Sequence, residues 1–400
     1  MLWLFRSGIV LFIYTGLTIY MGFRLFAFGR LLRPSLKRVV FWPGYIVLSY
    51  GFILFALFRL DRIGVFRLFE MYWPPFFICL FSIIVFLDLA SLALFFARKI
   101  TRRDTGFFAL RLMPAGTGAA LGLSLLLLVY GSFNARNIKT ARYELTVPER
   151  TGTESSRIVL VSDLHIGSTV DTKWAARIVD QINSASPDMV CITGDIFDHG
   201  LEGVTDKEGI AAELGRISAP WGVYACLGNH DTNRQTRSTE EITRFLEETG
   251  MVPLLDRAVQ VRLADETAAG IYVAGRRDAR PIGGQSKRLS MRELATSIAA
   301  VQDGGTTPKP LVILLDHQPV ELLQEAEAGI DLVLCGHTHR GQLFPGNFFT
   351  RVIYARAGGT HYGYWRKNNT QAVVTSGAGV WGPPVRIGTN SEIVILDLRF

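Results

Sequence analysis

The sequence predicts two parts of different class, an all-α bundle of about four transmembrane helices in residues 1–135 and an α/β domain in residues 156–400. Residues 1–135 contain long apolar runs, and their charged residues are confined to short gaps between the runs. Residues 156–400 instead alternate short apolar runs with amphipathic helical patterns, which is typical of an α/β domain. We expect residues 136–155, which are polar and without periodicity, to form the linker between the two parts.

Four apolar stretches are long enough to cross a bilayer, which takes roughly 20 residues. They lie at about 8–28, 39–58, 75–97 and 114–133. The first has no small-residue cleavage site, so we expect it to be retained as a helix. Arg24, near the end of the first stretch, is long enough to reach the interface. Asp88 lies inside the third stretch and is either a functional carboxylate or a polar contact with a neighbouring helix.

The basic residues between the apolar stretches predict the orientation. The first and third gaps hold 9 Lys and Arg residues, against 7 on the opposite side. Because cytoplasmic loops carry the excess of Lys and Arg, we expect a multi-pass protein of the cell (inner) membrane with its C-terminal domain on the outer, non-cytoplasmic face. The net charge of +7 is then explained by membrane flanks, and no zinc-finger spacing or basic helix favours nucleic-acid binding.

Apolar runs and helical patterns place the elements of the second part. We expect strands at 157–162, 188–193, 223–227, 271–274, 311–315, 331–335, 372–375 and 392–398. We expect helices near 173–184, 238–249 and 319–327. Since the later strands follow one another with fewer helices between them, we expect a mixed sheet arrangement.

Metal-capable or proton-capable side chains follow five of these strands. They are Asp163 and His165, then Asp195, then Asn229, His230 and Asp231, then His317, and finally His337 and His339. Ligands of open α/β sheets bind beyond the carboxyl ends of the strands, so we expect a shared site there. Mixed imidazole and carboxylate ligands suit manganese, iron, zinc or a related divalent ion. The absence of cysteine from the set argues against a structural zinc site.

The blocks also match a known family in their order. Asp163-Leu-His165, Gly194-Asp195, Gly228-Asn229-His230-Asp231, His317 and Gly336-His337-Thr-His339 together resemble the signature of the calcineurin-like metallophosphoesterases, over residues 157 to about 340. The segments 341–343 and 385–388 resemble the branch whose members often carry N-terminal membrane segments. The resemblance implies a four-layer α-β-β-α sandwich that carries two divalent metal ions.

The resemblance also implies which residues hold the two ions. One ion is assigned to Asp163, His165 and His339, the other to Asn229, His317 and His337, with Asp195 bridging them. Two neighbouring cations need a shared anionic ligand, and such a pair turns a bridging water into a hydroxide that attacks phosphorus. The glycines at 194, 228 and 336 allow tight turns beyond the strands.

The resemblance places His230 above the metals, where it protonates the leaving oxygen, and lets Asp231 hold its other ring nitrogen. Asp231 can equally cap the following helix. Asp198 is expected either to accept a hydrogen bond from a ligand histidine or to lie in the loop. His199 and His361 are either loop residues or substrate contacts.

The sequence allows two interpretations for each of two further residues, Asp316 and Arg340. Asp316 either supports His317 from behind or lies at the surface. Arg340, where the branch often has glycine, lies either at the mouth of the pocket or in solvent. The basic, aromatic stretch 362–367 contacts either a lipid headgroup or only solvent.

These observations predict a membrane-anchored, dinuclear-metal phosphoesterase that hydrolyses a phosphate ester or pyrophosphate. A lipid-linked substrate is favoured because the spans keep the domain beside a bilayer. The alternative is a membrane sensor or scaffold that binds a phospholigand without turnover, and missing ligands would indicate it, whereas every ligand position is filled. No phosphate-binding GxxxxGK[ST] loop occurs in the second part, and no GxSxG nucleophile turn is present.

Overall fold

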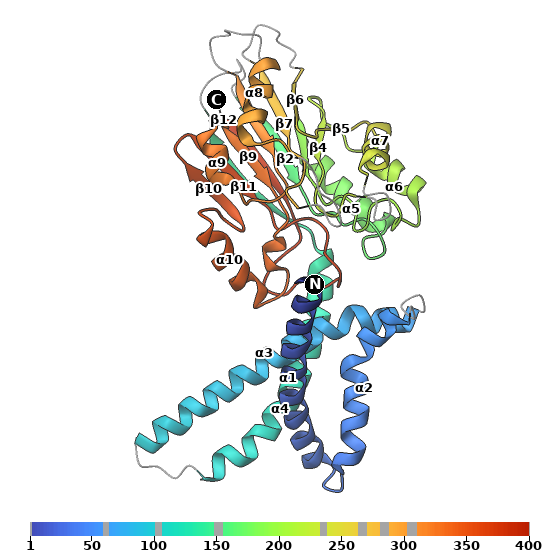
Figure 1. The fold of residues 1–400 in the computed structure, drawn as a ribbon, viewed down its shortest axis with the longest axis vertical. Helices are drawn as coiled ribbons and strands as arrows, with labels where there is room; N and C mark the ends of the chain where they lie inside the picture. Colours follow the sequence, from blue (N-terminus) through green and yellow to red (C-terminus); the bar gives the residue numbers. More distant parts are fainter. Residues whose placement is uncertain are drawn as a thin grey trace. The chain divides into compact units, whose positions relative to one another are not determined.

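The computed structural model describes residues 2–58, 64–100, 106–147, 155–232, 238–262, 270–280, 288–301 and 310–399. The chain forms two compact units, Met1–Gly131 and Ser132–Phe400 (Figure 1). Four of the basic residues used for the orientation, Arg59, Arg62, Arg102 and Arg103, lie outside the described residues, as do residues 148–154 of the expected linker.

Long helices make up the first unit. They are α1 (Leu2–Leu32), α2 (Arg38–Leu57), α3 (Gly64–Ile100) and α4 (Gly106–Arg136), whose end belongs to the second unit. Their candidate spans are Gly8–Leu32, Arg38–Phe55, Gly64–Ala97 and Pro114–Arg136. The prediction of four apolar spans is therefore confirmed, and many of their large apolar side chains are exposed, as membrane helices require.

The carboxylate predicted inside the third span connects two helices. Asp88 of α3 lies 3.0 Å from the guanidinium of Arg24 on α1, measured from Oδ1 to Nη2. It also accepts a hydrogen bond from the hydroxyl of Tyr20 on α1. Charged groups inside a bilayer are stable when they are paired. The structure thus favours the polar-contact interpretation of Asp88, and it pairs Arg24 with that carboxylate.

Two mixed six-stranded sheets form the centre of the second unit, with strand orders β1-β12-β2-β3-β4-β5 and β10-β11-β9-β8-β7-β6. The first contains β1 (Lys139–Thr146), β2 (Ser155–Val161), β3 (Met189–Thr193), β4 (Val223–Cys226), β5 (Val252–Pro253) and β12 (Glu392–Arg399). The second contains β6 (Arg257–Gln260), β7 (Ile271–Gly275), β8 (Leu311–Leu315), β9 (Leu332–Cys335), β10 (Gly363–Lys367) and β11 (Thr370–Val374). Strands β2 to β5 are parallel, as are β7, β8, β9 and β11.

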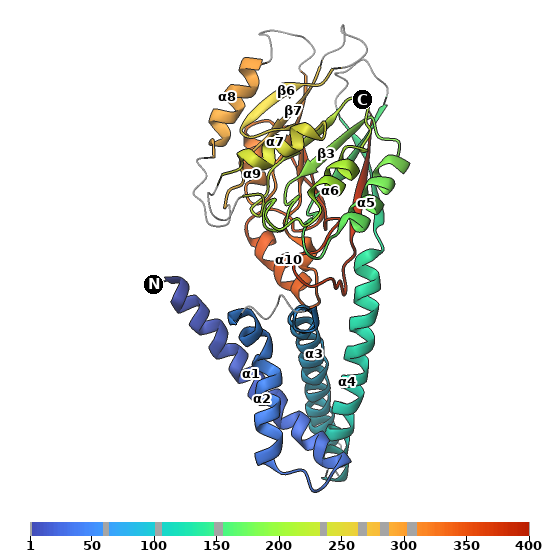
Figure 2. The same ribbon diagram turned by 90° about the vertical axis from the view of Figure 1, so that its right-hand side faces the viewer.

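Helices cover the outer faces of both sheets (Figures 1 and 2). Those packed on the first sheet are α5 (Thr172–Ser184), α6 (Lys207–Leu214) and α7 (Glu240–Glu248), and those on the second are α8 (Met291–Val301) and α9 (Leu322–Glu327). Buried apolar side chains fill three cores: helices against the first sheet, sheet against sheet, and the second sheet against helices. The predicted four-layer α-β-β-α sandwich is confirmed.

Burial explains why most of these strands could be predicted from the sequence. All five residues of β8 are buried, as in other parallel strands covered on both faces, so the strand is a continuous apolar run. The amphipathic α5 begins after Asp171, whose carboxylate accepts a hydrogen bond from the backbone of Trp174 at 2.9 Å. The eight predicted strands and three predicted helices are all present, with ends that differ by a few residues.

The expected linker is partly wrong. Lys139–Thr146 form the edge strand β1, which pairs in parallel with β12. This strand is only partly buried, so it lacks the apolar run by which the inner strands are recognised. The short elements β5, β6, β10 and α6 were also not expected, nor were α8 and α10 (Gly346–Arg356). Short length explains why β5, β6, β10 and α6 were missed, since a few residues give no clear hydrophobic period, but it does not explain α8 and α10, which have 11 residues each.

Candidate metal centre

The seven expected ligands meet at one place beyond the ends of five strands. They follow β2, β3, β4, β8 and β9, which belong to the two facing sheets. Six of the seven are buried, and His337 is partly exposed. The sandwich therefore brings together side chains that lie up to 176 positions apart, from Asp163 to His339.

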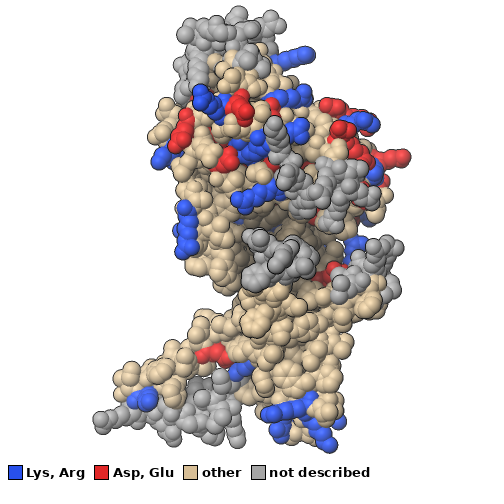
Figure 3. All heavy atoms as spheres, in the orientation of Figure 1, with Lys and Arg blue, Asp and Glu red and all other residues tan. Residues whose placement is uncertain are grey.

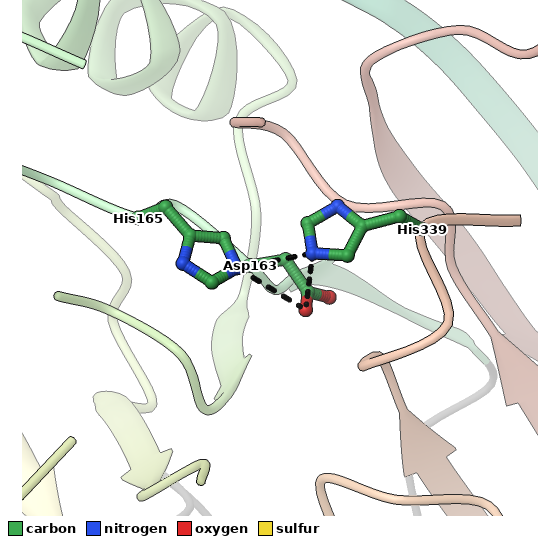
Figure 4. A group of neighbouring side chains, drawn as sticks. All are labelled: Asp163, His165 and His339. Atoms are coloured by element: carbon green, nitrogen blue, oxygen red, sulfur yellow. Dashed lines mark hydrogen bonds and ion pairs between the residues drawn. The ribbon is translucent and has the colours of Figure 1, made fainter. Parts of the chain in front are cut away.

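The first group consists of Asp163, His165 and His339 (Figure 4). Asp163 Oδ1 lies 3.3 Å from His339 Nε2 and 4.0 Å from His165 Nε2. The two Nε2 atoms are only 3.0 Å apart. Three lone-pair donors that converge so closely in a buried place are the arrangement by which a cation is held, so the residues present fit a divalent metal ion.

The second group lies directly beside the first. His317 Nε2 is 3.2 Å from Asn229 Oδ1 and 3.3 Å from His337 Nδ1. Asp195 Oδ2 lies 3.2 Å from His317 Nε2 and 3.6 Å from His165 Nε2. A single carboxylate oxygen therefore lies within reach of an imidazole nitrogen from each group. This is the position that a ligand shared by two ions requires.

Backbone groups orient the donors. His317 Nδ1 lies 2.7 Å from the carbonyl oxygen of Thr193 and donates to it, which leaves the lone pair of Nε2 for a metal ion. The backbone N–H of His337 donates to both oxygens of Asp163, at 2.9 and 3.1 Å. The N–H of His230 donates to Asp195 Oδ1 at 2.8 Å, so Oδ2 remains for the groups beside it.

Glycines make room for this packing. A Cβ atom on Gly336 would lie 1.9 Å from Ser162 Oγ and 2.4 Å from Asp163 Oδ2. Gly194 has φ of +81°, and its Cβ would lie 2.5 Å from the nitrogen of Gly228. Loops from neighbouring strands can approach this closely only because these side chains are absent.

Five of the expected ligands have left-handed backbone conformations. Their φ angles are 53° for Asp163, 47° for His165, 50° for Asp195, 69° for His337 and 46° for His339. Each such conformation costs a non-glycine residue about 1–2 kcal/mol. Strain of this kind is concentrated at functional sites, where the surrounding structure holds the side chains in position.

Burial and charge perturb the ligands in ways that suit metal binding. Burial raises the pKa of Asp163, and the neighbouring Asp195 adds to the effect. Burial also opposes ionisation of Asp195, but the adjacent His317 outweighs it and lowers the pKa of Asp195. Burial, together with His317, lowers the pKa of His337 to about 3. A neutral imidazole is the form that binds metal. Bound cations would offset the negative charge of the two buried carboxylates, Asp163 and Asp195.

Comparisons with known proteins identify the family. The model of the calcineurin-like phosphoesterases matches residues 156–341. An uncharacterized metallophosphoesterase of Campylobacter jejuni is 30% identical over 403 residues, which cover 100% of this chain and 99% of that protein. The chain belongs to the calcineurin-like metallophosphoesterases. It is thus a metal-dependent phosphoesterase with apolar N-terminal helices, as the sequence blocks predicted.

Other relatives match parts of this metallophosphoesterase. A zebrafish "transmembrane protein with metallophosphoesterase domain" is 32% identical over 287 residues, or 71% of this chain and 62% of that protein. An uncharacterized metallophosphoesterase of Helicobacter pylori is 32% identical over 243 residues, or 60% of this chain and 59% of that protein. The chain thus spans about six tenths of these two. The crystal structure of a zebrafish dimetal phosphatase aligns with a TM-score of 0.35 and 14% identity, over 57% of this chain and 89% of that one.

The metallophosphoesterase holds His230 differently from the expectation. Its Nδ1 lies 2.7 Å from the backbone carbonyl oxygen of Asp198. Asp231 instead turns inward, where its carboxylate accepts hydrogen bonds from the backbone N–H groups of Ile196, Phe197 and Gly228 at 2.8–3.1 Å. The expected contact between Asp231 and the His230 ring is therefore wrong. A backbone carbonyl has no sequence signal, so the true acceptor could not be predicted.

The carboxylate of Asp198 supports a different histidine. Its Oδ1 is 3.5 Å from His165 Nδ1, which agrees with the expected acceptor for a ligand histidine. Its Oδ2 is 3.5 Å from Nε2 of His199, whose side chain is 41% exposed. His361 contributes a backbone oxygen, which accepts a hydrogen bond from Thr338 at 2.6 Å. The guanidinium of Arg340 stacks on the ring of Tyr362, at 4.1 Å from its centroid.

Two buried arginine contacts complete the surroundings. Asp316 is fully buried and pairs with Arg276 at 3.1 Å and with Arg288 at 2.8 Å, so it is not a surface residue. Arg386 is fully buried as well and donates to backbone carbonyls, including those of Ser376 at 2.7 Å and His339 at 3.3 Å. Its contacts fix the last loops against the metal-binding edge.

Proposed function

We propose that the protein is a membrane-anchored phosphoesterase that uses two divalent ions, such as manganese, iron or zinc, to hydrolyse a phosphate ester or pyrophosphate. One ion is assigned to Asp163, His165 and His339, the other to Asn229, His317 and His337, with Asp195 shared. The observation that carries this proposal is the position of Asp195 Oδ2, within 3.6 Å of an imidazole nitrogen of both groups. When bound, the ions supply an activated water and offset the charge of the phosphoryl group.

His230 is proposed as the proton donor to the leaving oxygen. Its ring lies against that of His165, with centroids 5.0 Å apart, and its Nδ1 is committed to the Asp198 carbonyl. The proton for the leaving oxygen is therefore assigned to Nε2. Asp231 contributes by holding the loops after β3 and β4, on which Asp195 and His230 are carried.

A lipid-linked phosphate is the proposed substrate class. The four candidate spans keep the catalytic domain beside a bilayer, so a substrate anchored in the same bilayer reaches the site by lateral diffusion. The basic gaps between the spans support a domain on the non-cytoplasmic face. Substrates of that face include lipid phosphates and exclude cytoplasmic nucleotides.

The test uses the purified full-length protein, freed of metal and reloaded with manganese, iron or zinc. Bis-p-nitrophenyl phosphate, p-nitrophenyl phosphate and a panel of lipid phosphates are the substrates, and the release of nitrophenol or phosphate is measured. We expect metal-dependent turnover that is abolished in Asp195→Ala. Protein that binds two ions and a phospholigand without hydrolysing any substrate would instead support the sensor or scaffold alternative.

A further inference from the structure

An exposed apolar surface lies on the catalytic unit, formed by five residues that we call the apolar rim. They are Phe344, Phe348, Phe349, Ile353 and Trp381, with exposed fractions of 53%, 61%, 58%, 63% and 56%. Among the described residues from 137 to 399, after the end of α4, the other exposed large hydrophobic side chains are Leu323 and Tyr364, at 37% and 43%. A cluster of this kind, in contrast to scattered apolar residues, indicates an interaction surface.

Helix α10 carries three of the five rim residues. None of its residues is buried, although it follows directly from the loop that holds His339. Phe349 and Ile353 are four positions apart and therefore share one face of the helix. In Figure 3 most of the surface in the region of α10 is uncharged, with a basic side chain at its edge. Because no residue of α10 is buried, the helix packs only partly on its own unit and leaves these apolar side chains exposed.

The rim is joined to the mouth of the metal site. The ring of Trp381 lies 6.5 Å from that of His230, measured between centroids. Gln342 holds the backbone of Trp381 through two hydrogen bonds, accepting from its N–H at 2.9 Å and donating to its carbonyl at 3.0 Å. Gln342 itself lies between His339 and Phe344 in the chain. The same short segment therefore carries a metal-ligand candidate at one end and the rim at the other.

The charge around the rim favours an anionic partner. Residues 332–391 contain six Lys and Arg residues and no Asp or Glu, although the whole chain has 35 acidic residues. Arg351 and Arg356 lie on α10 and are exposed, as are Arg366 and Lys367 on β10. Aromatic and aliphatic side chains flanked by basic ones are typical of surfaces that bind the headgroup region of anionic bilayers.

Hydrogen bonds connect the rim to the end of a candidate span. The span Pro114–Arg136 ends in residues of the catalytic unit. There, the side chain of Asn134 donates to the carbonyls of Arg386 at 3.1 Å and Thr389 at 2.8 Å. The same loop binds the start of the rim, because the N–H of Phe344 donates to the backbone carbonyl of Ile387 at 2.9 Å. Within the catalytic unit, the last residues of α4 are thus hydrogen-bonded to the loop that also holds Phe344.

We propose that the apolar rim docks on the bilayer surface and presents the metal site to the phosphate of an amphiphile whose apolar part stays in that bilayer. Burial in the headgroup region covers the rim side chains that the unit leaves exposed, and the nearby Arg side chains contact anionic headgroups. The substrate part of this inference rests on the proposed function. The docking part does not, because it concerns binding alone.

Docking is tested with a fluorescent label in the full-length protein reconstituted in vesicles. The four native cysteines are buried, so bimane attached to Phe349→Cys reports on the rim, and Glu248→Cys on the exposed side of α7 is the matched control. The vesicles contain phosphatidylcholine, with or without phosphatidylglycerol, and brominated chains as quencher. We expect quenching of the label at 349, stronger with phosphatidylglycerol, and none at 248. Equal quenching at both positions, or none at 349, would overturn the proposal, as would a disulfide-linked dimer of the unlabelled Phe349→Cys protein in the same vesicles.

The link to catalysis is tested with the triple variant Phe348→Ser, Phe349→Ser and Ile353→Ser. Turnover of a lipid phosphate in the same vesicles should fall by about tenfold or more, because the local concentration of substrate at the site is lost. Hydrolysis of soluble bis-p-nitrophenyl phosphate should be unchanged, which also shows that the variant is folded. The proposal would be overturned if the variant and the wild type hydrolysed the lipid phosphate at equal rates. It would also be overturned if the variant lost activity equally on the lipid phosphate and on bis-p-nitrophenyl phosphate. If the wild type hydrolyses neither, the proposed function fails, while quenching still decides docking.

Discussion

Replacing Gly336 by alanine adds a single methyl group where the metal groups are most tightly packed. Its Cβ would lie 1.9 Å from Ser162 Oγ, 2.6 Å from Ser162 Cβ and 2.4 Å from Asp163 Oδ2. The serine is fully buried, and its hydroxyl donates to the Thr193 carbonyl at 2.9 Å, so it cannot move aside without losing that bond. The backbone at Gly336 itself has no left-handed φ, so the effect is a steric one.

The expected magnitude follows from these contacts. Overpacking costs about 1–3 kcal/mol, and loss of the serine hydrogen bond costs about 0.5–1.5 kcal/mol. Together they lower the free energy of unfolding by about 2–4 kcal/mol, or Tm by roughly 4–16 °C for a unit of this size. Displacement of the Asp163 carboxylate by about 1 Å should lower turnover by about 100-fold.

The assay combines thermal unfolding, metal content and hydrolysis of bis-p-nitrophenyl phosphate. Gly203→Ala is the matched control, because its Cβ would meet nothing closer than 3.4 Å and its φ is not left-handed. Adding Ser162→Ala to Gly336→Ala removes the 1.9 Å contact but leaves those with the Cβ of residue 162 and with Asp163, so stability should return only in part while turnover stays low. Wild-type stability, metal content and turnover in Gly336→Ala would refute the reasoning.

Three further predictions concern other parts of the site. His230→Ala should keep its metal but slow the hydrolysis of a substrate with a poor leaving group by about 10²–10⁴-fold, and an unchanged rate would exclude its role as proton donor. Asp316→Ala should lower the free energy of unfolding by about 3–5 kcal/mol in denaturant titrations, because it leaves the buried Arg276 and Arg288 without that carboxylate; a loss below about 1 kcal/mol would contradict this. Removing metal with a chelator should lower Tm reversibly, because Asp163 and Asp195 lose the cations that offset their charge, and an unaltered Tm would argue against bound ions.

The site was more predictable than its surroundings because each inner strand is a continuous apolar run that ends in a chemically distinctive block. Parallel strands of one sheet bring their ends to one edge, so the meeting of Asp163 and Asp195 followed from topology. The family resemblance implied that His317, which follows a strand of the facing sheet, joins them. The contact of His230 with the Asp198 carbonyl did not, since any residue offers that oxygen. The edge strand β1 was missed because it buries little, and its alternation is weak.

The apolar rim illustrates a different limit of sequence reasoning. In the sequence, Phe348, Phe349 and Ile353 are indistinguishable from core residues of an amphipathic helix. Only the structure shows that α10 buries none of its residues and that Trp381, far along the chain, lies near His230. Exposure is a property of the assembled unit, so it had to be observed.

The central claim is that the carboxylate of Asp195 is a ligand of both ions. Metal analysis of the purified full-length protein and of Asp195→Ala tests this claim most directly. The wild type should retain two divalent ions per chain, while the variant should lose affinity for both and retain fewer than one after dialysis. Two ions retained by the variant, or none bound by a folded wild type supplied with manganese, iron and zinc, would contradict the account.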